Sequence, residues 1–135
     1  MATIQIKFLP ECFTIYQYER QHEVSAEILK APWYTISKTK SELSIILPSE
    51  YSISDPAIAT EDGWRMFQVD AQMDFALVGI LARIVSPLKD EQIPVFVVST
   101  YDTDYIMVKE DKLTQAIKVL NEQPNIVVKP GESVL

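Results

Sequence analysis

The alternation of hydrophobic and polar positions is clearest in the second half of the chain. Residues 65–71 place Phe67, Val69 and Ala71 on one side and polar or sulfur-bearing residues on the other, which predicts a strand. Residues 74–89 carry apolar side chains at intervals of three and four, from Leu77 to Leu88. This spacing predicts an amphipathic helix directly after the strand.

The elements that follow complete a recognisable order. Residues 93–100 are rich in β-branched side chains and predict a buried strand, and residues 101–104 have the composition of a tight turn. Residues 105–109 then return as the second strand of a hairpin. An apolar stripe at residues 113–120 predicts a second helix, and residues 125–128 a last strand. The order β-α-β-β-α-β is that of the ferredoxin-like fold.

The first half repeats this pattern less regularly. Its predicted elements are strands at 4–8 and 13–18, a short helix at 25–30, and a hairpin of 33–39 and 42–47. At an offset of 62 residues the two hairpins coincide, and Ser37 falls on Ser99. We interpret the halves as two copies of one unit, the first with a shortened first helix.

These patterns predict an α+β fold of two ferredoxin-like units, each an antiparallel sheet with helices on one face. We expect a first, degenerate unit at residues 1–60 and a second at residues 61–135, with residues 49–63 as the linker. Exposed sheet edges are often covered by another chain, so a homodimer is expected.

Charge and composition exclude several classes of partner. Apolar residues make up 47% of the chain, which is enough for a globular core, and the net charge is −7. Nucleic acids and anionic membranes select basic surfaces, so neither is an expected partner. No apolar run approaches the roughly 20 residues that span a bilayer, and the amino terminus lacks the features of a signal peptide. We therefore expect a cytoplasmic protein.

The sequence offers little for catalysis. The single cysteine, Cys12, excludes an internal disulfide, and with only one histidine a Cys/His zinc site is excluded too. The three glycines are far apart, so no glycine-rich phosphate loop is present. Asp102 and Asp104 are too few for a calcium cage. We expect no enzyme activity, no cofactor and no metal.

Four segments carry a family resemblance. Residues 79–84 (GILARI) resemble the helix-opening segment of ACT domains, and residues 74–81 (DFALVGIL) and 99–106 (STYDTDYI) resemble a family of short tandem ACT proteins. Residues 34–46 (YTISKTKSELSII) resemble the hairpin of the first unit in the same family. That family is related in its ACT units to CASTOR-type arginine sensors and to the regulatory part of aspartate kinases. The resemblance implies a regulatory module that binds an amino acid at an interface between ACT units.

The predicted helix start is the candidate site for the ligand's carboxylate. Backbone amides of Val78, Gly79 and Ile80 lack partners within the helix, and the helix dipole favours an anion there. Gly79 has no side chain, so a ligand can approach the backbone closely. The alternative is that Gly79 only allows the helix to pack against the sheet.

Acidic and aromatic residues nearby are the candidates for the rest of the ligand. Asp74 and Asp104 are the candidate partners of an ammonium or guanidinium group, and Phe75 and Tyr101 are candidate walls. The resemblance implies that Asp104 matches an aspartate that contacts ligand in the arginine sensors, with Thr100 and Tyr101 beside it. The alternatives are that Asp74 is a helix N-cap, that Asp104 serves only the turn, and that the aromatics are core residues.

Three functions remain open at this point. The first is a non-catalytic sensor of a free amino acid or a similar small metabolite. The second is a protein-interaction adaptor whose ACT units serve only as assembly surfaces. The third is a detached regulatory subunit of an amino-acid biosynthetic enzyme such as aspartate kinase, with no ligand of its own.

Overall fold

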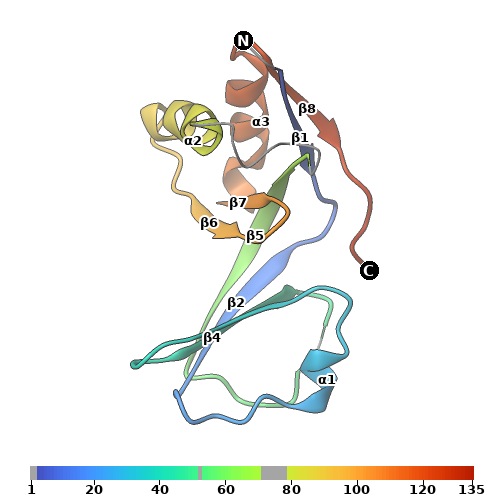
Figure 1. The fold of residues 1–135 in the computed structure, drawn as a ribbon, viewed down its shortest axis with the longest axis vertical. Helices are drawn as coiled ribbons and strands as arrows, with labels where there is room; N and C mark the ends of the chain where they lie inside the picture. The colour runs from blue at the N-terminus through green and yellow to red at the C-terminus, as the bar shows by residue number, and fades with distance from the viewer. Residues whose placement is uncertain (1–2, 52, 71–78) are drawn as a thin grey trace. The chain divides into compact units, whose positions relative to one another are not determined.

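The computed structural model describes residues 3–51, 53–70 and 79–135 and divides the chain into two compact units (Figure 1). The outer unit combines residues 1–10 with 65–132, and the inserted unit combines residues 11–64 with 133–135. The strand β5 (Ala59–Val69) runs from one unit into the other.

The inserted unit is a sheet with little helix. It contains β2 (Phe13–Tyr18), the one-turn helix α1 (Ala26–Leu29), β3 (Thr35–Lys38), β4 (Leu43–Pro48) and the first half of β5. The strands lie in the order β3-β4-β2-β5, with antiparallel pairs throughout. This is the ferredoxin-like order. The described residues between β4 and β5, where that fold has its second helix, form neither helix nor strand.

The outer unit has two full helices. After β5 it contains α2 (Ile80–Asp90), β6 (Phe96–Ser99), β7 (Asp104–Lys109), the short 3₁₀ segment η1 (Glu110–Lys112), α3 (Leu113–Asn121) and β8 (Ile126–Pro130). The amino-terminal strand β1 (Ile4–Phe8) joins the same sheet, whose order is β6-β7-β5-β1-β8. β1 is antiparallel to β5 and parallel to β8.

One hydrophobic core holds the outer unit together. Alternate residues of its strands, including Ile6, Phe67 and Ile106, are fully or nearly fully buried on one face of the sheet. Ile84 and Leu88 of α2 and the buried residues of α3 belong to the same cluster. Both helices therefore cover one face, and the predicted α+β fold of ferredoxin-like units is confirmed.

Two local predictions differ from the structure. Residues 59–63 were assigned to the linker, but they open β5 and pair with β2. Their side chains are mostly exposed and Gly63 has a positive φ of 73°, so backbone pairing rather than hydrophobic alternation defines this part of the strand. The strand at the amino terminus was predicted, but its parallel pairing with β8 was not, because alternation within one strand does not identify its neighbours.

The predicted helix at 74–89 corresponds to α2, and residues 71–78 lie outside the described residues. Within the parts of the chain that the structure describes, no helix is long and apolar enough to cross a membrane.

Candidate functional site

The start of α2 has the backbone geometry of an exposed donor site. Gly79 precedes the helix in the left-handed conformation, with φ of 80° and ψ of 9°. The first helical bond runs from the amide of Arg83 to the Gly79 carbonyl over 3.0 Å. The amides of Ile80, Leu81 and Ala82 therefore lie in the first turn, where a helix supplies no acceptors.

Gly79 is required here by its conformation rather than by tight packing. A left-handed φ is costly for most residues with a side chain. Among the described residues, apart from Gly79 and its neighbours in the chain, no heavy atom lies within 4 Å of the place where a Cβ would stand. The alternative that Gly79 allows close helix packing therefore finds no support in the described surroundings.

The other predicted residues of this segment divide into two groups. The side chain of Ile80 is partly buried and packs against the core of the outer unit, so it anchors the helix start and leaves its amide for other uses. Asp74, Phe75 and Val78 lie outside the described residues. Their roles stay predictions.

The β6–β7 hairpin is closed by two threonines. The amide of Thr100 donates to the carbonyl of Thr103 over 2.8 Å, and the amide of Thr103 donates to the Thr100 hydroxyl over 3.3 Å. The Thr103 hydroxyl donates to the carbonyl of Val69, at the end of β5, over 2.5 Å. The turn is therefore both rigid and fastened to the strand that leads to α2.

Asp104 begins β7 with its carboxylate in a defined contact. Ser99 lies directly opposite Asp104 in the hairpin register, and its hydroxyl donates to Asp104 Oδ1 over 2.6 Å. Asp104 is half-buried, whereas Ser99 is exposed. Sequence reasoning named Asp104 and missed Ser99, although a turn of residues 100–103 places residues 99 and 104 opposite each other.

Tyr101 lies at the turn itself and is 85% exposed. The alternative that it is a core residue is therefore wrong, while its predicted role as a wall of a ligand pocket stays a prediction.

The candidate residues that the structure describes are thus all connected to the same end of β5, either by a hydrogen bond or along the chain. The hairpin that carries Thr100 and Asp104 is bonded to Val69. The chain leaves Val69 and reaches Gly79, where α2 begins, ten residues later. A carboxylate on one segment and first-turn amides on the other are complementary to the two charged ends of a free amino acid.

A surface cleft elsewhere in the outer unit has a less suitable charge. Its volume is about 620 Å³, and it is lined by residues of α2, by Val119 of α3 and by the segment from Glu122 to Ile126. Asp90, Glu91 and Glu122 contribute three carboxylates against the single guanidinium of Arg83. The carboxylate of an amino acid would meet mainly like charge there.

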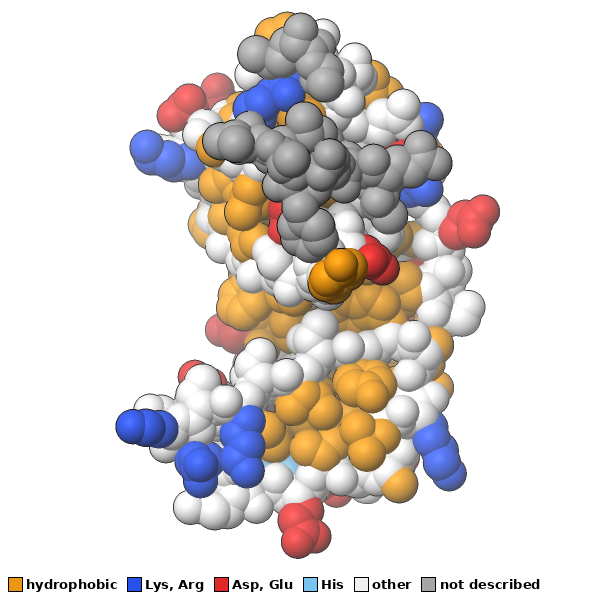
Figure 2. Space-filling view, in the orientation of Figure 1, with side chains coloured by type: hydrophobic (Ala, Val, Ile, Leu, Met, Phe, Trp, Pro, Cys, Tyr) orange, Lys and Arg blue, Asp and Glu red, His pale blue; other side chains and the backbone are white. Residues whose placement is uncertain are grey.

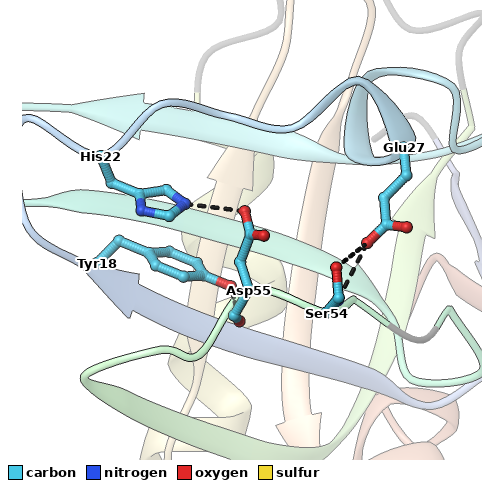
Figure 3. A network of polar contacts seen from close by, with 5 residues as sticks. All are labelled: Tyr18, His22, Glu27, Ser54 and Asp55. Atoms are coloured by element: carbon cyan, nitrogen blue, oxygen red, sulfur yellow. Dashed lines mark hydrogen bonds and ion pairs between the residues drawn. The ribbon is translucent and has the colours of Figure 1, made fainter.

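In the inserted unit, the polar groups after the end of β2 contact one another (Figure 3). After β2, His22 Nε2 lies 3.0 Å from Asp55 Oδ2, and the Tyr18 hydroxyl donates to the Asp55 carbonyl over 3.1 Å. The Tyr18 and His22 rings are stacked with centroids 4.3 Å apart. Burial raises the pKa of the Tyr18 hydroxyl, and the negative charge of Asp55 adds to the effect.

These contacts fasten the chain between β4 and β5, as does Glu27 Oε1, which accepts from the Ser54 amide over 3.0 Å. Tyr51 and Ile53 of the same segment pack against the core of this unit. Figure 2 shows hydrophobic side chains gathered on the visible face of the inserted unit. We name the contacts of Tyr18, His22 and Asp55 the clasp.

Within the described ranges, no cluster of three or more His, Cys, Asp or Glu side chains is arranged to hold a metal ion.

In a comparison with known families, the family model of the ACT domain matches residues 59–122. The matched stretch begins with β5 and ends just after α3, so it contains α2 and the β6–β7 hairpin.

Two curated relatives carry the same name in different organisms. The chain is 29% identical over 105 residues to "Cytosolic arginine sensor for mTORC1 subunit 1" of Homo sapiens, and 27% identical over 103 residues to that of Rattus norvegicus. These matches cover 73% and 72% of this chain but 32% and 31% of the relatives. The chain therefore spans about a third of the length of the curated relatives it matches.

Solved structures extend the likeness to nearly the whole chain. Protein Atu0741 from Agobacterium tumefaciens superposes with a TM-score of 0.82 and 25% identity, over 98% of each chain. The regulatory subunit of aspartate kinase from Thermus thermophilus, in its ligand-free form, superposes with a TM-score of 0.64 over 90% of this chain and 98% of that one. Its identity is 7%, so this second likeness shows the fold alone.

Proposed function

We propose that this protein is a non-catalytic regulatory protein that binds a free amino acid or a similar small metabolite, because its residues 59–122 match the model of the ACT domain, as the sequence resemblance predicted. The ligand's carboxylate meets the first-turn amides of α2, and its ammonium meets Asp104. The protein acts in the cytoplasm, and binding changes its association with a second copy or with a partner enzyme.

The contact of Asp104 with Ser99, on a hairpin bonded to the end of β5, is the observation that carries this proposal. It places a half-buried carboxylate at the strand end from which the chain proceeds to the first turn of α2. Hydrogen bonds to charged groups are stronger than those between neutral groups, so a zwitterion gains from both ends at once.

The names of the relatives support the same class of function. The curated relatives are named as arginine sensors. Every free amino acid carries an ammonium group for Asp104 to receive, so this contact alone selects no side chain. The names of the curated relatives make arginine the first candidate.

Isothermal titration with each of the twenty free L-amino acids tests the proposal. We expect at least one to bind with one site per chain, and Asp104→Ala to weaken that binding by about 10- to 100-fold, since a charge-assisted contact is lost. Asp102→Ala is the matched control, because it removes an exposed carboxylate from the same hairpin. Its affinity should equal that of the unaltered protein.

If none of the twenty amino acids binds at millimolar concentrations, the proposal that the protein binds a free amino acid is refuted. The protein would then be better explained as an interaction adaptor or as a regulatory subunit without its own ligand. Equal losses in Asp104→Ala and Asp102→Ala would place the effect in the net charge of the hairpin rather than in a contact with the ligand.

A further inference from the structure

We infer that Ser99 is a positioning residue for the ligand, because its hydroxyl holds the Asp104 carboxylate in the orientation that receives the ammonium group. The inference rests on the proposed function and deepens it by naming the residue that sets the geometry of the ammonium acceptor.

The contact between the two side chains is short and well defined. The Ser99 hydroxyl donates to Asp104 Oδ1 over 2.6 Å, within the range of charge-assisted O–H···O⁻ bonds. The two residues are also direct partners in the β6–β7 ladder, so their Cα atoms are fixed by the hairpin backbone. Only the side-chain torsions of Asp104 remain to be set, and this hydrogen bond sets them.

Ser99 has little to contribute by packing. It is exposed at the last position of β6, while Asp104 across the hairpin is half-buried. An exposed serine whose hydroxyl is directed to a carboxylate acts through that hydrogen bond. The bond occupies one oxygen, and a carboxylate offers about four acceptor positions, so it can still accept from a ligand.

The hairpin is also held by hydrogen bonds that do not involve Ser99. Thr103 donates to the Val69 carbonyl, and the turn is closed by the Thr100–Thr103 contacts. Removing the Ser99 hydroxyl therefore releases the Asp104 side chain without releasing the hairpin. Restricting a binding group before the ligand arrives lowers the entropy lost on binding.

The test compares Ser99→Ala with the unaltered protein, using the free L-amino acid that binds best in the panel of twenty and its N-acetyl derivative. The derivative lacks the ammonium group that Asp104 is proposed to receive. We expect Ser99→Ala to lower the affinity for the free amino acid by about tenfold. The affinity for the N-acetyl derivative, which binds more weakly, should be unchanged.

Two further variants separate positioning from general structure. Ser99→Thr keeps a hydroxyl and suits a strand, so it should restore most of the affinity. Ser37→Ala removes an exposed serine from β3, in the other hairpin, and should bind both ligands as the unaltered protein does. Thermal denaturation of Ser99→Ala should match that of Ser37→Ala within about 2 °C.

Each contrary result has a distinct meaning. If Ser99→Ala binds normally while Asp104→Ala does not, the positioning role is wrong and the proposed function stands. Equal weakening of the free and N-acetylated ligands would show a general structural role and would also overturn the inference. If no amino acid binds the unaltered protein, the proposed function and this inference fail together.

Discussion

The inserted and outer units are both ferredoxin-like, although β1 lies between β5 and β8 in the outer sheet, and they differ in what covers their sheets. In the outer unit, α2 and α3 supply buried residues to a single core. In the inserted unit, a helix of four residues and the irregular segment between β4 and β5 take their place. The clasp of Tyr18, His22 and Asp55 then supplies contacts that helix packing would otherwise supply.

The difference between the two units indicates which of them can bind a ligand. At the end of β2, the polar groups are satisfied by one another within the clasp. At the end of β5, Gly79 begins a helix of 11 residues, and Asp104 is presented by the hairpin. The polar groups at the strand end therefore support stability in the inserted unit, whereas in the outer unit they form a candidate binding site.

The largest expected effect comes from opening the core of the inserted unit. Leu47 is fully buried there, and Leu47→Ala should lower the free energy of unfolding by about 2–5 kcal/mol through lost burial and a residual cavity. If the two cores are separate cooperative regions, amide hydrogen exchange will rise in β2, β3 and β4 and stay slow in α3. Equal acceleration in α3 would show that the cores unfold as one. Leu88→Ala, in the core of the outer unit, is the matched control and should produce the reverse pattern.

An intermediate effect is expected at the start of α2. Gly79→Val places a β-branched residue at a φ of 80°, and should destabilise the outer unit by about 1–3 kcal/mol because of backbone strain. Gly79→Asn is the control, since asparagine tolerates this conformation better than other residues with a side chain. Urea denaturation measures both. Equal losses in the two variants would point to crowding by a side chain rather than to the left-handed backbone.

The smallest expected effect lies in the clasp. Tyr18→Phe removes the hydrogen bond to the Asp55 carbonyl and should cost about 0.5–1.5 kcal/mol near neutral pH. Burial, followed by the charges of Asp55 and Tyr16, raises the pKa of Tyr18, so the folded state holds this proton more tightly than the unfolded chain. The associated stability is present below about pH 10 and is lost as the pH rises further.

Urea denaturation at about pH 8 and about pH 11 compares the two proteins. The unaltered protein should lose more stability between these values than Tyr18→Phe, because the variant lacks the titrating hydroxyl. An identical loss in both would show that Tyr18 does not contribute to the alkaline sensitivity, whatever the other tyrosines and lysines do.

The sequence predicted most of the strands and helices, because their hydrophobic periods are strong. It did not predict that residues 59–63 open β5, since these residues do not alternate and their strand is defined by backbone pairing with β2. It predicted a strand at the amino terminus but not its place between β5 and β8, which depends on pairing across more than 100 residues.

For the site, composition and resemblance identified Gly79, Thr100 and Asp104. They did not identify the bond between Ser99 and Asp104, because a register argument requires the exact limits of the turn. The chain's one histidine, His22, served only to exclude a zinc site. Its contact with Asp55 lies 33 residues away in sequence and follows from the path of an irregular segment that no periodicity describes.

The position of β1 between β5 and β8 has a consequence for how the polypeptide matures during synthesis. The outer sheet needs a strand made within the first 10 residues and another made after residue 125, so its hydrogen-bond ladder cannot close until translation of this region is almost complete. Ile4 and Ile6 must remain without their final partners while the inserted unit is already able to form. Contacts of such long sequence separation slow folding, and although β1 can pair with β5 once residue 69 is made, its other edge stays open until β8 is made.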